Sequence, residues 1–236
     1  MMKYRYSFLK FLVILTVSGQ AAAQSSNSVP KNKYKGVVIT TKKLLDQSVK
    51  LDSNKEMISL STLIPGLTLQ LAYATTNNFT HQALYPSKAK EAWLRLPAAK
   101  ALQKVQKDLA ATNYGLKIFD AYRPYSVTEK FWELIHDERY VANPANGSGH
   151  NKGTAVDLTI IDLKTKKELD MGTAFDNFTD SAHHGFTRLP PQVLAYRKLL
   201  KDTMIKYGFK PLETEWWHYS WPGNFEVLDV SFDELR

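Results

Sequence analysis

One stretch of the sequence constrains the fold more than any other. Residues 148–157 read Ser-Gly-His-Asn-Lys-Gly-Thr-Ala-Val-Asp, which places the imidazole of His150 and the carboxylate of Asp157 seven residues apart. The chain continues as Leu-Thr-Ile-Ile, so the run from residue 155 is β-branched and apolar, which predicts a buried strand. On a strand, Gly153, Ala155 and Asp157 share one face, and the two small residues leave space beside the carboxylate.

Two interpretations of His150 and Asp157 are open at this point. A loop rich in Gly, Ser and Asn, residues 143–149, allows His150 to fold back towards Asp157. Neutral imidazole and carboxylate are ligands of Zn²⁺, so a divalent ion is the simplest occupant of the space. The alternative is a hydrogen bond between the two side chains that stabilises a loop. The rest of the chain has to decide between them.

A third ligand is available near the C-terminus. Residues 213–221 read Glu-Thr-Glu-Trp-Trp-His-Tyr-Ser-Trp, and this aromatic density predicts a strand. A histidine within a Trp-rich strand is usually a core residue, but His218 completes a set of two His and one Asp. Such a set leaves a fourth tetrahedral position for water, as in a catalytic zinc site. Glu215 and His218 face oppositely on a regular strand, so Glu215 must lie in a loop or bulge entering the strand if both serve one site.

The composition excludes other kinds of site. The chain contains no cysteine, which rules out disulfides, thiolate nucleophiles and thiolate metal ligands, so a metal site must use His, Asp and Glu. The adjacent pair His183 and His184 is not expected to bind one ion, because neighbouring side chains point in different directions. A length of 236 residues with 44% hydrophobic and 23% charged residues fits one globular domain. No basic patch interleaved with aromatic residues stands out, so a nucleic-acid partner is not predicted.

The N-terminus has the pattern of a secretory signal peptide. Lys3, Arg5 and Lys10 precede a short apolar run at residues 11–17, and three alanines end at Ala23, where cleavage is expected. The apolar run is too short for a stable membrane anchor, and without cysteine no lipid can be attached at the cleavage site. Of the net charge of +8, three positive charges belong to this segment, which leaves +5 on the mature chain. We therefore expect an exported protein, periplasmic or secreted, without a stable membrane anchor.

The domain organisation follows from the same reading. A signal peptide at residues 1–23 is followed by a polar, flexible leader at 24–55 and by one catalytic domain at 56–236. Within the domain, three helices are expected at residues 96–111, 126–136 and 190–207, and short strands at 67–71, 116–119 and 213–221. Two Asn-Phe-Thr triplets, at residues 78–80 and 177–179, match the N-glycosylation pattern, although such triplets are common by chance.

Two further polar residues lie at strand ends. Arg123, in the run Asp-Ala-Tyr-Arg-Pro at residues 120–124, follows a short apolar strand, where a substrate-binding arginine would be placed. The alternative is a plain surface arginine after a turn. Tyr73 follows the strand at 67–71, where it either lines a pocket or packs in the core with a satisfied hydroxyl.

Taken together, these motifs resemble the zinc D-Ala-D-Ala peptidases, which share a fold with the zinc domain of hedgehog signalling proteins. The specific resemblance is to D-alanyl-D-alanine dipeptidases of the vancomycin-resistance type, and it covers roughly residues 60–222. The residues that carry it are Ser148, His150, Gly153, Ala155, Asp157, Glu215, Trp217 and His218, with further landmarks at 73–75, 78–80, 120–124, 171–172, 175–176 and 181–184.

The resemblance implies an α+β fold in which helices pack on a mainly antiparallel sheet. It implies one Zn²⁺ per chain, with His150, Asp157 and His218 as ligands. The implied reaction is zinc-dependent hydrolysis of D-Ala-D-Ala to two D-Ala, by zinc-bound water with Glu215 as general base. The implied role is cell-wall peptide turnover.

The resemblance also assigns substrate contacts. Arg123 is implied to hold the scissile carbonyl as a second catalytic residue. Tyr73 and Asp176 are implied to contact the ammonium group of the substrate, and Ser148 lies beside its carboxylate end. The predicted partner is therefore a small D,D-dipeptide, and no oligomeric state is predicted.

Two other functions stay open. One is a D,D-carboxypeptidase or endopeptidase acting on peptidoglycan stem peptides, and the other is a non-catalytic zinc-containing module that binds the cell wall. A dipeptidase needs a pocket closed at both ends, whereas a carboxypeptidase needs the amine end open, so Tyr73 and Asp176 favour the dipeptidase. The chain departs from the family pattern at Gln70 and Ala72, where an acid and a base are expected. Its exported leader also departs, because the resistance enzymes work in the cytoplasm.

Overall fold

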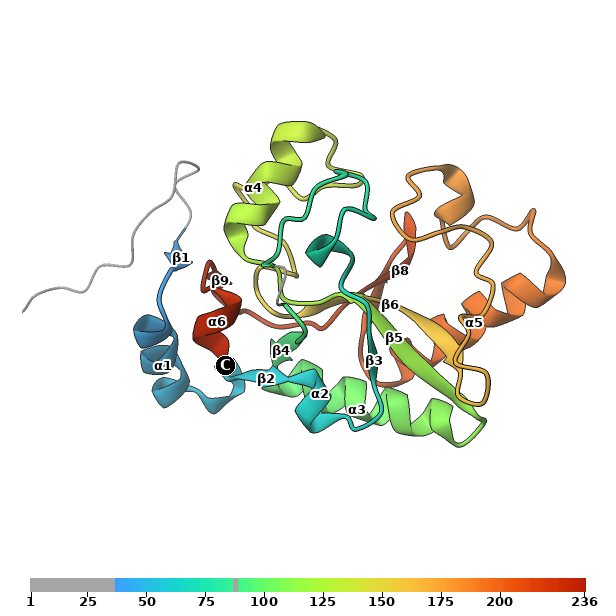
Figure 1. Ribbon diagram of the computed structural model, residues 1–236, viewed down its shortest axis with the longest axis horizontal. Coiled ribbons are helices and arrows are strands. Elements are labelled where there is room, and N and C mark those ends of the chain that lie inside the picture. Colours follow the sequence, from blue (N-terminus) through green and yellow to red (C-terminus); the bar gives the residue numbers. More distant parts are fainter. Residues whose placement is uncertain (1–36, 87–88) are drawn as a thin grey trace, which may run out of the picture.

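The computed structural model of the protein describes residues 37–86 and 89–236. The predicted signal peptide, residues 1–23, and the predicted leader up to residue 36 lie outside the described residues. In Figure 1, helices pack around a central sheet whose strands carry the labels β3, β5, β6 and β8. Within the described ranges, none of the helices combines the length and the apolar character that a membrane crossing requires.

Five strands form the central sheet. They are β3 (Thr68–Leu69), β5 (Tyr114–Asp120), β6 (Ala155–Asp162), β7 (Lys210–Leu212) and β8 (Glu215–Ser220). Their spatial order is β3-β5-β6-β8-β7, and every neighbouring pair is antiparallel except β3 with β5. The apolar run predicted as a buried strand is β6, the middle strand, and all of its residues except the last are buried. The predicted α+β class with a mainly antiparallel sheet is confirmed.

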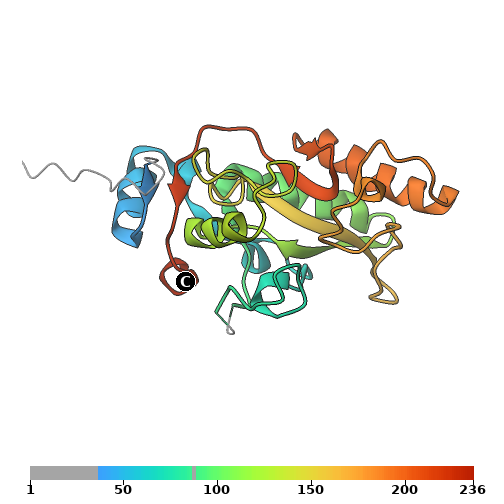
Figure 2. The same cartoon turned by 90° about the horizontal axis from the view of Figure 1, so that it is seen from above.

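Two long helices cover one face of this sheet. Helices α3 (Leu96–Ala110) and α5 (Pro191–Lys206) contact each other and the sheet. Figure 2 shows the molecule from above, with α3 in green and α5 in orange. Pro97 lies in the first turn of α3, where its missing N–H costs no hydrogen bond. The apolar stripe of α3 packs into the core; its members Ala98, Leu102, Val105 and Leu109 are at most 2% exposed.

Helix α4 (Tyr125–Leu134) follows directly on β5 and lies on the other side of the molecule from α3 in Figure 1. The observed bounds of α3, α4 and α5 agree with the predicted helices to within two residues at each end. The strand expected at residues 67–71 is shorter, because only β3 pairs and the chain then turns into η2 (Ala72–Ala74). A further short turn of helix, η3 (Asp180–Ala182), lies in the long segment between β6 and α5.

Part of the predicted flexible leader is regular structure. Residues 37–55 contain β1 (Val38–Ile39), helix α1 (Lys42–Leu51) and η1 (Ser53–Lys55). Thr41 caps α1, since its hydroxyl accepts a hydrogen bond from the Leu44 amide at 3.3 Å, and Leu45 packs in the core. Regular structure is therefore already present at residue 38, upstream of residue 56. This polar segment contains a short amphipathic helix, in which Leu45 and Ser48 are buried.

The remaining short elements join the two ends of the described chain. Strand β2 (Met57–Ser59) pairs with β4 (Trp93–Arg95), and helix α2 (Leu60–Leu63) follows β2. Strand β9 (Val227–Leu228) pairs in parallel with β1, and the short helix α6 (Phe232–Leu235) follows it. Residues near both ends therefore lie side by side, which Figure 1 shows as blue beside red.

Candidate active site

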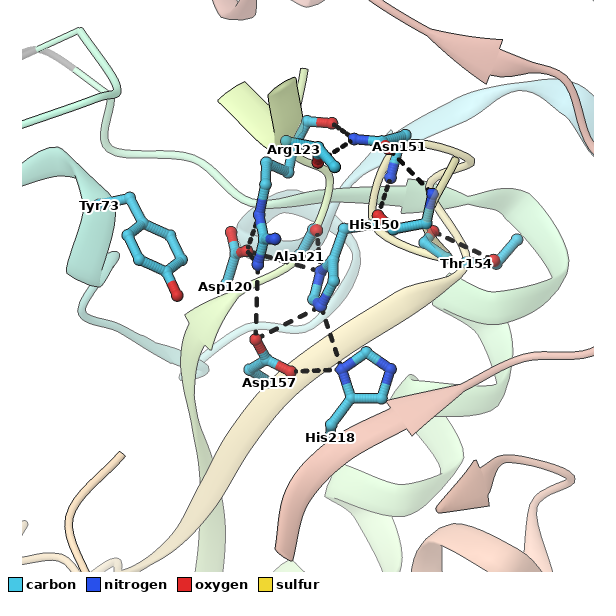
Figure 3. A network of polar contacts seen from close by, with 12 residues as sticks. Tyr73, Asp120, Ala121, Arg123, His150, Asn151, Thr154, Asp157 and His218 are labelled. Atoms are coloured by element: carbon cyan, nitrogen blue, oxygen red, sulfur yellow. Dashed lines mark hydrogen bonds and ion pairs between the residues drawn. The ribbon is translucent and has the colours of Figure 1, made fainter. Parts of the chain in front are cut away.

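Three polar residues form a row across the sheet. Asp120 on β5 lies directly opposite Asp157 on β6, and Asp157 lies directly opposite His218 on β8. Residues opposite each other on neighbouring strands project from the same face, so this register brings the three side chains together. The Nδ1 atom of His218 is 2.9 Å from Oδ1 of Asp157 (Figure 3).

His150 reaches the same face from the turn before β6. Gly153 was expected on the strand but lies in this turn at a φ of +69°, a conformation that glycine adopts readily. A Cβ at this position would lie 2.9 Å from the flexible end of the Met57 side chain, so it is the backbone conformation of the turn that favours glycine. The Nδ1–H of His150 donates to the carbonyl of Ala121 at 2.7 Å, which leaves Nε2 facing Asp157 and His218.

The donor atoms of His150, Asp157 and His218 fit one divalent ion. His150 Nε2 is 3.2 Å from His218 Nδ1 and 3.4 Å from Asp157 Oδ2. A tetrahedral zinc with bonds of about 2.0–2.1 Å needs donors roughly 3.3 Å apart, close to these separations. The outer ring nitrogens are held as well: Ala121 accepts from His150, and His218 Nε2 is 3.1 Å from the Ser220 hydroxyl. Within the described residues, these three side chains form a cluster able to hold a metal ion.

Glu215 lies beside this cluster. It is the first residue of β8, where the pairing with β7 shifts: Pro211 is opposite Tyr219, but the next residue, Leu212, is opposite Glu215. The resulting bulge in β8 lets Glu215 and His218 face one cavity, with Oε2 of Glu215 4.0 Å from Nδ1 of His218. The pKa of Glu215 is raised to about 8, chiefly by burial; His218 opposes this rise and the negative charge of Asp157 contributes to it.

Arg123 is buried and points into the cavity, which excludes the surface-arginine interpretation. Its Nε and Nη2 atoms donate to Oδ2 of Asp120 at 2.9 and 2.6 Å. Its guanidinium carbon lies 4.5 Å from the ring centroid of Phe131 and 5.1 Å from that of Tyr73. Nη2 is also 3.9 Å from Oδ2 of Asp157. The arginine is therefore held in one orientation beside the candidate metal ligands.

Tyr73 and Asp176 form a hydrogen-bonded pair in the lining of the cavity. The Tyr73 hydroxyl donates to Oδ1 of Asp176 at 3.0 Å, so both earlier interpretations of the tyrosine hold: it is buried, and its hydroxyl lines the cavity. Burial raises the pKa of Asp176 to about 7, and the charge of Asp157 adds to this rise. Ser148 lines the cavity as well; its amide donates to Oδ1 of Asn151 at 2.9 Å.

The cavity has a volume of about 280 Å³. This is slightly below the usual range for ligand pockets, about 300–1,000 Å³, and suits a small substrate. All eight site residues expected from the sequence line this one cavity: Tyr73, Arg123, Ser148, His150, Asp157, Asp176, Glu215 and His218. His183 and His184 are not among its lining residues.

Three supporting residues were not expected from the sequence. Asp120 holds Arg123, and the hydroxyl of Tyr85 donates to Asp120 at 2.6 Å. The fully buried amide of Asn151 donates to the carbonyl of Arg123 at 2.9 Å and to the hydroxyl of Thr128 at 2.8 Å. For Asn151 a signal exists, since a polar residue directly after a candidate ligand is a natural second support. Asp120 depends on strand register, which the local sequence does not reveal.

Comparison with known proteins identifies the family of this chain. The family model described as D-ala-D-ala dipeptidase matches residues 53–234. The chain belongs to the D-Ala-D-Ala dipeptidase family. It is thus a member of a peptidase family, and the recognition made from the sequence motifs is confirmed.

Two relatives and one solved structure are similar to this chain to different degrees. A D-alanyl-D-alanine dipeptidase of Escherichia coli (strain K12) is 33% identical over 172 residues, 73% of this chain and 88% of that protein. One from Enterococcus faecalis is 29% identical over 178 residues, covering 68% of this chain and 88% of that protein. VanYB in complex with D-Alanine-D-Alanine matches 57% of this chain and 75% of that chain, with 15% identity and a TM-score of 0.39.

Proposed function

We propose that this D-Ala-D-Ala dipeptidase family member hydrolyses D-Ala-D-Ala to two D-Ala, with one Zn²⁺ held by His150, Asp157 and His218. The observation that carries the proposal is the arrangement along one small cavity. A carboxylate, Glu215, lies beside the three candidate ligand side chains, and the carboxylate of Asp176 lines the same cavity. A free dipeptide offers an ammonium group to that carboxylate and a scissile amide to the centre.

The chemistry follows from the positions of these groups. Bound at the three donors, Zn²⁺ would act as a Lewis acid and lower the pKa of water towards neutrality. A pKa near 8 gives Glu215 the proton affinity of a base that works close to neutral pH. Glu215 takes a proton from the attacking water while the oxygen of that water bonds to the carbonyl carbon of the substrate. It then gives that proton to the amine as the C–N bond breaks.

Arg123 stabilises the charge that develops on the carbonyl oxygen. Its guanidinium is fixed by two hydrogen bonds to Asp120, so it need not reorganise as the charge appears. A preorganised donor of this kind contributes about 3–4 kcal/mol to lowering the barrier. In the same cavity, Asp176 in its ionised form pairs with the substrate ammonium, and Tyr73 orients that carboxylate.

The proposal includes an exported location and a role in cell-wall peptide turnover. Its support is the N-terminal pattern of basic residues, a short apolar run and three alanines, in residues 1–23. An exported dipeptidase would act on dipeptide released from the wall.

The direct test is alanine release from D-Ala-D-Ala by the mature chain, with and without a chelator. L-Ala-L-Ala and an N-acylated D-Ala-D-Ala stem mimic are assayed in parallel. The matched control is Glu215→Gln, which keeps the shape of the side chain and removes the base. We expect chelator-sensitive cleavage of the free D,D-dipeptide alone, and a loss of at least about 10²-fold in the control.

The other outcomes would contradict the proposal in distinct ways. Cleavage of the acylated stem mimic would assign the protein as a carboxypeptidase and remove Asp176 from substrate binding. Binding of zinc without cleavage of any substrate would leave the wall-binding module as the function.

A further inference from the structure

The two Asn-Phe-Thr triplets adopt the same local structure. In the first, the Asn78 side-chain oxygen accepts from the Thr80 amide at 2.9 Å and from the Thr80 hydroxyl at 2.6 Å. In the second, Asn177 accepts from the amide of Thr179 at 3.1 Å and also from its hydroxyl. Each triplet is therefore a tight turn closed by its own asparagine, with a phenylalanine at its centre.

The two phenylalanines line the cavity and contact each other. The rings of Phe79 and Phe178 lie 5.3 Å apart at 68°, an edge-to-face contact between loops about a hundred residues apart in the sequence. Phe178 also contacts Tyr140, whose ring centroid lies 5.0 Å away, from a third loop. All three rings line the active-site cavity and are only half-buried. We name Phe79, Phe178 and Tyr140 the aromatic bridge.

The aromatic bridge lies beside Asp176 in the cavity lining. Phe178 follows Asp176 by two residues, and both line the cavity. The ring of Phe79 lies 6.2 Å from the ring of Tyr73, which itself donates to Asp176. The same turns that place the carboxylate thus also place the rings around it.

We propose that the aromatic bridge closes the cavity beyond the substrate ammonium and so restricts this protein to free dipeptides. The inference rests on the proposed function and names the residues that set its substrate length. A peptide extended or acylated at its amine has to pass the point where rings from three loops contact one another. The bridge offers no hydrogen-bonding group of its own to an additional amide, apart from the hydroxyl of Tyr140. Phe178 is the central member, because it contacts both other rings.

The test compares D-Ala-D-Ala with N-acetyl-D-Ala-D-Ala, the smallest extension at the amine, by kcat/KM. Phe178→Ala should raise the ratio of acetylated to free dipeptide at least tenfold over the unmodified protein. Tyr140→Ala, which leaves the contact between Phe79 and Phe178, should shift the ratio in the same direction but less. The matched control is Phe186→Ala, a half-buried phenylalanine of the same long segment that does not line the cavity, and its ratio should not change.

An unchanged ratio in folded Phe178→Ala would overturn the inference. If that variant does not fold, Phe178→Leu, which keeps an apolar contact with less reach, should show a smaller shift of the same sign. An unchanged ratio there would overturn the inference equally. Failure of the proposed function looks different, because the unmodified protein would then cleave neither substrate, or would already cleave both.

Discussion

At the scale of single residues, Arg123 is a cation that the protein buries beside its own counter-ion. The carboxylate of Asp120 takes two of its hydrogen bonds, and Tyr85 donates to the same carboxylate from the other side. A lysine at position 123 keeps a cation beside the buried carboxylate of Asp120. It cannot form the two parallel hydrogen bonds that the guanidinium makes to that carboxylate. Arg123→Lys should lower kcat by about 10²–10³-fold. Zinc content per chain should stay the same, because none of the three ligands changes.

The measurement for Arg123→Lys is steady-state kinetics on D-Ala-D-Ala together with elemental analysis of the purified protein. Arg139→Lys serves as the control, because Arg139 is exposed at the rim of the cavity and pairs with Asp137. Retained turnover in Arg123→Lys, and also in Arg123→Ala, would remove this residue from the mechanism.

A second residue-scale prediction concerns the pH dependence of substrate binding. Burial raises the pKa of Asp176 to about 7, the charge of Asp157 adds to the rise, and the hydrogen bond from Tyr73 opposes it. In the proposed function the ionised carboxylate of Asp176 binds the substrate ammonium, so KM should fall as the pH rises through about 7. Tyr73→Phe removes a donor to the charged form, so the same fall should occur up to about one pH unit higher.

The check is KM for D-Ala-D-Ala from pH 5.5 to 8.5, with Tyr114→Phe as the control. Tyr114 is half-buried at the start of β5, and it does not line the cavity. A KM profile that stays in place in Tyr73→Phe would show that this hydroxyl does not act on Asp176.

At the scale of elements, the sequence predicts the ligands better than their supports. His150 and Asp157 belong to one local turn and strand, so their proximity follows from spacing alone. His218 joins them only because β8 pairs with β6, and Asp120 only because β5 pairs with β6 on the other side. Strand register is a property of the whole sheet. A motif contains the residue types, but the pairing of strands in the sheet determines which of these side chains lie close together.

The bulge in β8 is a structural feature that can be predicted from the sequence alone. Glu215 and His218 are three residues apart and serve one site only if the strand is irregular, and the register shift against β7 supplies that irregularity. Helix α1 is the opposite case. Its sequence, Lys-Lys-Leu-Leu-Asp-Gln-Ser-Val-Lys-Leu, lies in a polar segment, and only contact with the rest of the domain makes its short apolar side informative.

The elements around the ligand turn are held by a buried cation, Arg95, at the end of β4. Its side chain is 0% exposed, and burial lowers its pKa to about 10, although Glu226 raises it. It donates to the carbonyls of Lys55, Lys152 and Glu226, so it joins η1, the His150 turn and the segment before β9. All three contacts come from this one side chain.

Arg95→Met should therefore lower the free energy of unfolding by about 3–5 kcal/mol, because three carbonyls lose a buried donor at once. The measurement is urea unfolding at neutral pH. Lys104→Met is the control, since Lys104 is exposed on the adjoining helix α3 and should change stability by no more than about 0.5 kcal/mol. Equal midpoints for the two variants would mean that the three segments hold together without Arg95.

At the scale of the whole molecule, the C-terminal segment completes the site. The Leu228 amide donates to the carbonyl of Asn151 at 2.9 Å, and Asp229 accepts from the Ser126 amide at 3.0 Å. The hydroxyl of Tyr122 donates to the carbonyl of Val230 at 2.8 Å. Residues 228–230 thus support the segment after β5 and the turn before β6. The turn that contains His150 and the segment that contains Arg123 are therefore both linked to a segment that is distant from them in the sequence.

Whole-molecule stability should fall in mild acid because of His184, a histidine outside the active site. Burial lowers the pKa of His184 to about 4, nearby Lys201 lowers it as well, and its Nε2 atom is buried without a hydrogen-bond partner. Between about pH 6.5 and pH 4 the unfolded chain binds a proton here that the folded chain does not. The free energy of unfolding therefore decreases as the pH falls through this window, by about 1–2 kcal/mol after allowance for partial solvent screening.

In His184→Gln, the difference in unfolding free energy between pH 7 and pH 4.5, measured by urea titration, should shrink by that amount. Carboxylates that titrate in the same range contribute equally to both proteins and cancel in the comparison. His136→Gln, at an exposed position after α4, should leave the difference as it is, and an equally unaltered difference in His184→Gln would refute the assignment.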